Sequence, residues 1–464
     1  MKQSVSCKSY IHLFSLIWLF WLFSGYSTGY ASPDESSISL SGFMELRYDG
    51  RYLSEDSGED HKLHQIVDIS IKENEWGHFR FNLCGDMTED LDGEADDDEV
   101  DRTRTIRDTW DSSTIGFLYV CQAEIYQLGP IDYARFGRQY VNHELGTTHV
   151  DGFNCLFKFD FFSKRIKPFA YGGIPVRLYE DGEYWDAREV GGGAHLFWDR
   201  WTRITLEHQL IEEEPDITGT YGESGESRYE QSACAIRRSL FQKGHGSVSL
   251  FLLDNSPKRV NSTFSILIDK PDLGIDASYS YQFEEIDQTP TAIFPYTGLV
   301  GPIKPYHNAT IDIMTGIYKD SVWLSGGTEW RLLDSGEEES EFNHSYNREY
   351  LALIVEDLPM KGIELSLQAD YWQVMDDSNE DSILTFTGGI GYEKREQIRL
   401  FLGSSYSLYS YDYFADPEEK TDVYTVHSDV RCYLQPGLYF DARYELDIYD
   451  INEHRFVVTV GIEI

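Results

Sequence analysis

The stretch HRFVVTVGIEI, residues 454–464, alternates between two kinds of side chain at every second position. One set is apolar: Phe456, Val458, Val460, Ile462 and Ile464. The intervening set is Arg455, Val457, Thr459, Gly461 and Glu463. Because successive side chains of a β-strand point to opposite faces of its sheet, this stretch predicts a strand with one apolar and one mostly polar face.

The same two-residue period recurs along the chain, for example in residues 38–48, 363–371, 424–434 and 438–448. No stretch shows a convincing helical period, so we expect an all-β chain. Many of the alternating segments reach the roughly 9–11 residues that a tilted strand needs to cross a bilayer. Soluble sandwich strands are shorter, at about 5–6 residues. The pattern therefore favours membrane-spanning strands, and a secreted β-solenoid or repeat sandwich is the alternative.

Short, often basic links between these segments alternate with longer acidic ones. The short links are residues 72–78, 128–131, 163–168, 198–202, 241–246, 269–274, 318–322, 357–362, 393–397 and 434–438. The longer links include residues 86–113, 211–226, 284–306, 333–347 and 411–421, and a less certain one at 254–261. Tight turns at one end and longer loops at the other are typical of outer-membrane barrels. The sequence thus predicts a single transmembrane antiparallel up-and-down β-barrel of about 18–22 strands, with an even number of them.

Residues 1–31 read as a secretory signal peptide, which leaves residues 32–464 for the barrel. Lys2 and Lys8 precede an apolar stretch at 11–23, and Gly29-Tyr30-Ala31 matches a cleavage site. A retained membrane anchor is the alternative. We expect export to the outer membrane of a Gram-negative bacterium, with lipid, lipopolysaccharide and the barrel-assembly machinery as partners. The last strand ends in Ile464 rather than in the usual aromatic residue, so its match to a barrel-assembly signal is imperfect.

The chain is strongly acidic, with 80 Asp and Glu against 39 Lys and Arg and a formal net charge of −41. Nucleic-acid binding is disfavoured because it needs basic patches. An aromatic fraction of 15% argues against disorder. No CxxC or CxxCH occurs, and residues 90–101 do not match the spacing of an EF-hand loop, so no metal or other cofactor is expected.

Catalysis has little support in the sequence. There is no GxSxG or HExxH motif. The pairs His143–Glu144 and His344–Ser345 fall in predicted loops, and we expect no convergent partners for them. The chain is therefore not predicted to be an enzyme, and no catalytic residue is proposed.

The side chains opposite each apolar set are expected to line the pore. The clearest acids of this set are Glu45, Glu207, Asp276, Glu329, Glu364, Asp370, Asp429, Asp441, Glu445, Asp447 and Glu463. The clearest bases are Arg47, Arg80, Arg203, Arg331, Arg431, Arg443 and Arg455. Acids outnumber bases on this predicted face, and the two signs are interspersed. Since a pore selects through the charges that line it, such a lumen suits small polar solutes with a mild cation or neutral preference. For any single pair, the alternative is an ordinary ion pair worth about 0–1 kcal/mol.

Residues 131–153 read IDYARFGRQYVNHELGTTHVDGF. The core Arg135-Phe136-Gly137-Arg138-Gln139, followed by Asp151-Gly152, resembles a signature of the alginate-export family and related porin-like barrels. The resemblance covers this segment and the general strand layout. It implies that Arg135, Arg138 and Gln139 lie near the pore constriction and that residues 140–150 form an infolded loop. Read from the residues alone, Arg135 and Arg138 could equally brace a loop against its acidic neighbours.

These observations favour a porin-like channel for diffusion or export of small polar solutes. A structural barrel sheath of a porin–cytochrome-type complex and a polysaccharide export pore are the alternatives, and an outer-membrane hydrolase is the least favoured. The interspersed acids of the predicted lumen argue against alginate itself as the solute. Nothing in the sequence indicates the solute, the direction of transport or the oligomeric state.

Overall fold

The computed structural model describes residues 38–54, 59–73, 78–91, 114–161, 164–176, 187–213, 227–240, 243–269, 272–285, 303–318, 321–334, 344–375, 382–394, 397–409, 421–448 and 452–464. Within these ranges, no helix is long and apolar enough to cross a membrane. The predicted signal peptide at residues 1–31 lies outside the described residues. So does most of the acidic link at 86–113.

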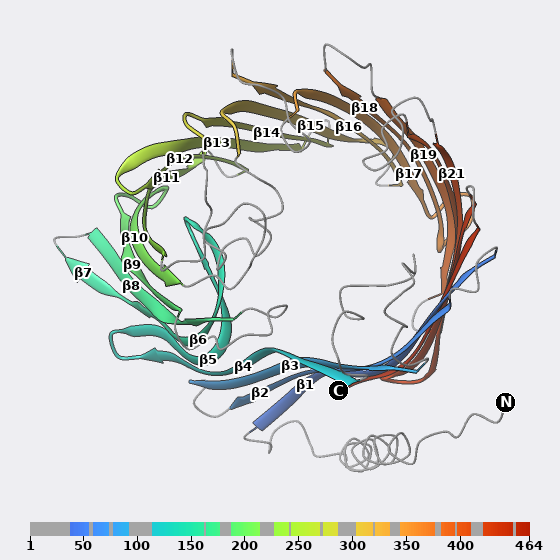
Figure 1. Ribbon diagram of the computed structural model, residues 1–464, viewed down its shortest axis with the longest axis horizontal. Helices are drawn as coiled ribbons and strands as arrows, with labels where there is room; N and C mark the ends of the chain where they lie inside the picture. The colour runs from blue at the N-terminus through green and yellow to red at the C-terminus, as the bar shows by residue number, and fades with distance from the viewer. Residues whose placement is uncertain are drawn as a thin grey trace.

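Strands form one closed sheet around an open centre (Figure 1). Their bounds are β1 Ile38–Leu53, β2 Glu59–Glu73, β3 Phe79–Asp90, β4 Thr114–Leu128, β5 Ile131–His143, β6 Gly146–Phe157, β7 Phe159–Phe161, β8 Lys164–Pro175, β9 Arg188–Phe197, β10 Thr202–Glu213, β11 Ser227–Leu240, β12 Gly244–Leu253, β13 Ser256–Asp269, β14 Asp272–Gln282, β15 Tyr306–Tyr318, β16 Val322–Leu333, β17 Tyr346–Glu356, β18 Ile363–Val374, β19 Ser382–Lys394, β20 Ile398–Tyr409, β21 Thr421–Gln435, β22 Leu438–Ile448 and β23 Glu453–Glu463.

Neighbouring strands pair antiparallel around the ring, and β1 pairs with both β2 and β23, which closes it. The strand β6 and the three-residue element β7 both pair with β8, so they are two parts of one strand. The fold is therefore an all-β antiparallel barrel of 22 strands. This confirms the predicted fold class, at the upper end of the expected range and with the expected even number.

The break between β6 and β7 has a local cause on the neighbouring strand. Pairing with β8 stops at Leu156–Phe169 and resumes at Phe159–Ile166. Pro168 lies in the gap, and proline has no backbone N–H to donate to a ladder. The sequence prediction of a turn at 163–168 was wrong in extent, because β8 already begins at Lys164.

Two other predicted links are also shorter than expected. The uncertain link at 254–261 is a tight turn at Asp254–Asn255, where both residues have positive φ (49° and 64°). Two positive φ values in succession are the requirement of the type I′ turn that joins hairpin strands. Strand β13 therefore resumes at Ser256. Similarly, β3 extends to Asp90, so the acidic link begins later than residue 86.

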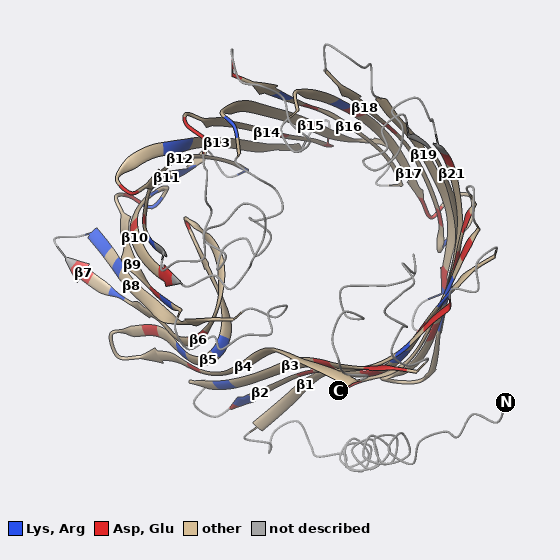
Figure 2. Cartoon of the chain, viewed as in Figure 1, with Lys and Arg blue, Asp and Glu red and all other residues tan. Residues whose placement is uncertain are grey.

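The two faces of the barrel wall differ in polarity. Leu206, Leu351 and Leu402 are examples of apolar strand residues that are more than half exposed, at 58%, 56% and 54%. Large aromatic residues near strand ends, among them Phe79, Tyr279, Tyr371 and Phe456, are exposed as well. Charged residues of both signs occur along strands around the ring (Figure 2). A closed barrel with an exposed apolar exterior is the arrangement that a bilayer demands of β-structure.

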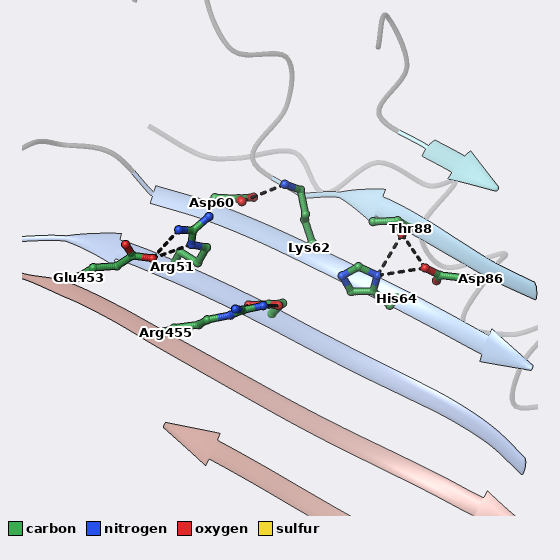
Figure 3. A network of polar contacts seen from close by, with 9 residues as sticks. Arg51, Asp60, Lys62, His64, Asp86, Thr88, Glu453 and Arg455 are labelled. Atoms are coloured by element: carbon green, nitrogen blue, oxygen red, sulfur yellow. Dashed lines mark hydrogen bonds and ion pairs between the residues drawn. The ribbon is translucent and has the colours of Figure 1, made fainter. Parts of the chain in front are cut away.

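Polar contacts join the first and last strands where the ring closes (Figure 3). Arg51 of β1 donates to the Glu453 carboxylate of β23 at 2.5 Å, and Arg455 of β23 donates to Asp49 of β1 at 2.7 Å. On the adjacent strands, the Thr88 hydroxyl lies 3.0 Å from Nδ1 of His64. The register between β1 and β23 places Arg51 opposite Arg455, and each arginine binds a carboxylate two residues away on the other strand, so two diagonal ion pairs cross the seam.

Candidate functional site

Strand β5 leaves its neighbour β4 at Gly137. The ladder between these strands ends at the pair Cys121–Arg138, although β4 itself begins at Thr114. Gly137 has a φ of +112°, and a Cβ there would lie 2.2 Å from the carbonyl oxygen of Cys121. Only glycine fits both demands. From this bend the far part of the β5–β6 hairpin turns into the ring of strands (Figure 1).

We use "inner hairpin" for residues 139–150, which carry this turn inward. The resemblance implied an infolded loop over 140–150. The structure has a β-hairpin there instead, with β5 running to His143 and β6 starting at Gly146. Gln139 is fully buried, and its Nε2 lies 3.3 Å from the carbonyl oxygen of Gly152 and 3.4 Å from that of Gly137. This amide thus lies against the backbone of the bend.

Arg135 and Arg138 form separate ion pairs on either side of Gly137 in β5. Arg135 lies 2.7 Å from the buried carboxylate of Glu124, which is also 3.8 Å from Arg80. Arg138 pairs with Asp151 across the hairpin at 2.6 Å and donates to the carbonyl oxygen of Leu118 at 3.1 Å. That carbonyl belongs to the part of β4 that β5 has left. Both arginines thus brace the bend.

The tip of the inner hairpin is bound to strand β10 through Glu207. The Glu207 carboxylate accepts the backbone N–H of Glu144 at 2.8 Å and the hydroxyl of Tyr171 at 2.6 Å. Nδ1 of His143 lies 3.1 Å from the same carboxylate and its ring stacks on Tyr171. The expectation that His143–Glu144 would lack convergent partners was wrong. The partners come from β8 and β10, which sequence spacing alone does not bring together.

The carboxylate of Glu144 meets two arginines on the wall. It accepts from Arg237 at 2.6 Å and lies 3.9 Å from Arg203. Arg203 and Arg237 are register partners on β10 and β11, so they share one face. We call the face that carries Glu207, Arg203 and Arg237 the inner face. The sequence did not single out Arg237, because the small residues Ala233 and Ala235 before it weaken the polar alternation of β11.

Strands β15 to β18 carry a second cluster of polar side chains. Glu329 accepts from Asn308 at 3.1 Å and from the Tyr346 hydroxyl at 2.8 Å. The guanidinium of Arg331 lies 4.4 Å from the ring centre of Tyr306. One strand further, Arg348 binds the carboxylate of Asp370 at 2.6 Å.

Strands β21 and β22 carry ion pairs across strands rather than along them. Arg431 binds Asp441 at 2.9 Å, and Arg443 lies 3.7 Å from Asp429. Residues directly opposite in a ladder are closer than residues two apart on one strand, so the interspersed charges neutralise each other between strands. Glu445 stands opposite His427 and Arg455 in register.

The predicted residues of β1 lie beside the seam. Glu45 accepts a hydrogen bond from the Tyr439 hydroxyl. Arg47 stands opposite His64 on β2 and Thr459 on β23.

Within the described part of the chain, no group of three or more His, Cys, Asp or Glu side chains could hold a metal ion. None of the cysteines there forms a disulfide.

No protein-family model and no curated protein matches this chain. Among solved structures, it is similar to the translocation pore of the P pilus usher PapC, with a TM-score of 0.48 and 7% identity over 92% of this chain and 100% of that one. It is also similar to OccAB4 of Acinetobacter baumannii, with a TM-score of 0.45 and 8% identity over 93% and 100%. OpdK of Pseudomonas aeruginosa, solved with vanillate, gives a TM-score of 0.43 and 9% identity over 92% and 99%. Likeness at this level carries nothing about function, and the proposals below rest on the barrel itself.

Proposed function

We propose that this protein is an outer-membrane, porin-like channel for the diffusion or export of small polar solutes. One observation carries the proposal: a ring of 22 strands encloses a polar inner face, and an inner hairpin is bound across part of it. Barrels larger than about 16 strands are wide enough for an aqueous channel unless something fills them. The inner hairpin narrows the lumen: the contacts at its tip are polar, while Val141 and Val150 in its body pack with Tyr171 of β8.

The charges on the inner face favour small polar solutes over a polyanion. Ion pairs such as Arg431–Asp441 and Arg348–Asp370 leave little free positive charge to attract a long anionic chain. Because acids outnumber bases among the predicted pore-lining residues, we propose a mild preference for cations or neutral solutes. The constriction in this proposal lies where the inner hairpin meets β10, with Arg135, Arg138 and Gln139 holding its bend.

The same proposal places the chain in the outer membrane of a Gram-negative bacterium. Residues 1–31 would act as the export signal. The barrel-assembly machinery would insert the strands, and lipid and lipopolysaccharide would surround the apolar exterior. No catalytic role is proposed.

Conductance of the purified full-length protein in planar bilayers tests the function. We expect stable current steps and, in a KCl gradient, a reversal potential displaced modestly toward that of the cation. Absence of current from protein that shows the β-sheet signal in circular dichroism would refute the channel. Clear anion selectivity would refute the proposed lumen charge and favour export of a polyanion.

A further inference from the structure

A basic cavity lies at the short-turn end of strands β9 to β13. Its volume is about 580 Å³, and its lining includes Arg200, Arg203, Arg237, Arg238 and His245. The formal net charge of the chain is −41, so a cavity lined mainly by basic residues differs in sign of charge from the protein as a whole. The volume lies in the range, about 300–1,000 Å³, of sites for small organic ligands.

Asp199 is the one acid among the described residues that line this cavity. Its carboxylate accepts the backbone N–H groups of Trp201 at 2.6 Å and Thr202 at 2.8 Å, and the Thr202 hydroxyl at 3.1 Å. The N–H of Trp201 is the main cause that holds the pKa of Asp199 below its ordinary value. The oxygens of Asp199 thus bind mainly the turn 198–202, and Arg238 is the one arginine of the cavity that contributes to lowering this pKa.

Two of the arginines stand directly opposite each other. Arg203 and Arg237 are register partners, and like charges at such positions repel. The carboxylate of Glu144 relieves this repulsion, at 2.6 Å from Arg237 and 3.9 Å from Arg203. Glu144 is nearly buried, with a side chain 6% exposed, whereas those of Arg203 and Arg237 are 33% and 49% exposed. The pair thus already holds one carboxylate, supplied by the inner hairpin, and remains accessible from the cavity.

We propose that this cavity binds small organic acids with two or more carboxylates. One carboxylate replaces that of Glu144 between Arg203 and Arg237, since a guanidinium fork matches a planar carboxylate. The other reaches the guanidinium of Arg200 or the imidazole of His245, which also line the cavity. Binding therefore releases one of the contacts that hold the inner hairpin to the wall.

The inference deepens the proposed channel and rests on it, since it names a solute class for a site on the inner face. A local anion site is compatible with a mildly cation-preferring lumen, because bulk selectivity reflects all lining charges whereas binding reflects one cluster. A solute that binds weakly and must pass the hairpin would reduce the ionic current while it resides there.

Binding is measured by isothermal titration calorimetry on the full-length refolded barrel, with succinate and citrate as probes and acetate and glucose as controls. We expect heat from succinate and citrate and little from acetate or glucose. Inorganic phosphate is titrated in the same way, as an anion without a carboxylate. Phosphate binding more tightly than either probe would overturn the carboxylate assignment, as would equal binding of acetate and succinate.

Three variants locate the site. Arg237→Gln should weaken citrate binding by about tenfold, because it removes the better-placed guanidinium. Glu144→Gln should strengthen binding by about threefold, because the competing carboxylate is gone while the side-chain shape is kept. Arg228→Gln is the matched control on the same strand: its side chain pairs with Glu230 and Glu212 at the other end of β11 and should leave binding unchanged.

The outcomes separate this inference from the proposed function. Weakened binding in Glu144→Gln would overturn the competition, and unchanged binding in Arg237→Gln would overturn the site. If the barrel conducts but binds neither citrate nor succinate, the cavity inference fails while the channel stands. If it binds them but carries no current, the channel fails while the binding site stands.

Discussion

Two sectors of the barrel wall are built from the same alternating strands but differ in what their inner face meets. In the hairpin sector, strands β8 to β11, the inner hairpin lies against the wall, and the side chain of Glu207 is 0% exposed. In the open sector, strands β15 to β22, Arg348 pairs with Asp370 while remaining 34% exposed. One strand pattern thus supports a buried polar network on one side and a wet ion-pair wall on the other. The cause is local: a single glycine turns β5 away from its neighbour.

Removal of the inner hairpin should produce the largest change. Replacing residues 139–150 with a short Gly-Ser turn takes away the segment bound to β10 and leaves the strands of the open sector untouched. We expect single-channel conductance to rise by about twofold or more, because the obstruction is lost. The measurement is single-channel current in planar bilayers. A current equal to that of the parent protein would show that the hairpin does not limit flow.

A side chain at the bend should lower the stability of the hairpin sector, with a smaller effect than removal of the inner hairpin. In Gly137→Ala, the new Cβ would meet the carbonyl oxygen of Cys121, and the positive φ would be strained. We expect a loss of about 1–3 kcal/mol, measured by urea unfolding followed by tryptophan fluorescence. Gly116→Ala on β4 is the control, since a Cβ there meets nothing within 4 Å. Equal losses in both variants would contradict the role of the bend.

Matched charge removals should sharpen the comparison. Glu207→Gln in the hairpin sector replaces the buried carboxylate that accepts from the Glu144 N–H and the Tyr171 hydroxyl. We expect the free energy of unfolding to fall by about 1–3 kcal/mol. Asp429→Asn breaks a 3.7 Å pair whose arginine is 59% exposed, and it should cost about 1 kcal/mol or less. The free energy of unfolding in urea checks both. A larger loss in Asp429→Asn would reverse the assignment of buried and wet sectors.

The smallest effect is expected at the long-loop rim, where Glu284 follows β14. Lys258 donates to its carboxylate at 2.9 Å, and this hydrogen bond lowers the pKa of Glu284. A lowered pKa in the folded state means that the contribution is present above the unfolded pKa and is lost as the pH falls through the folded pKa. We expect carboxylate chemical shifts to titrate below the ordinary glutamate range. In Lys258→Met the midpoint should return toward that range, and an unchanged midpoint would contradict the assignment.

Much of the wall could be predicted from the sequence, because its period is two and its turns are short. Residues 438–448 and 454–464 alternate cleanly, and both are strands. The tight turn at Asp254–Asn255 was obscured because the following Ser256–Asn261 contains few apolar residues. The Glu144–Arg237 contact could not be predicted, because it joins residues 93 positions apart through a bend that only Gly137 permits. Periodicity describes which face a side chain takes, but it carries no information about one hairpin folding onto another strand.

The seam between β1 and β23 has a consequence for how the molecule reaches its native state. Arg51 and Glu453, which pair there, are 402 residues apart in the chain. Contacts of such long sequence separation form late, since the entropy of closing the intervening loop must be overcome first. Until β23 arrives, both outermost strands expose unpaired backbone groups, which invite pairing with other chains. The vulnerable species is thus the nearly complete open sheet, and its lifetime is set by the slowest pairing in the ring.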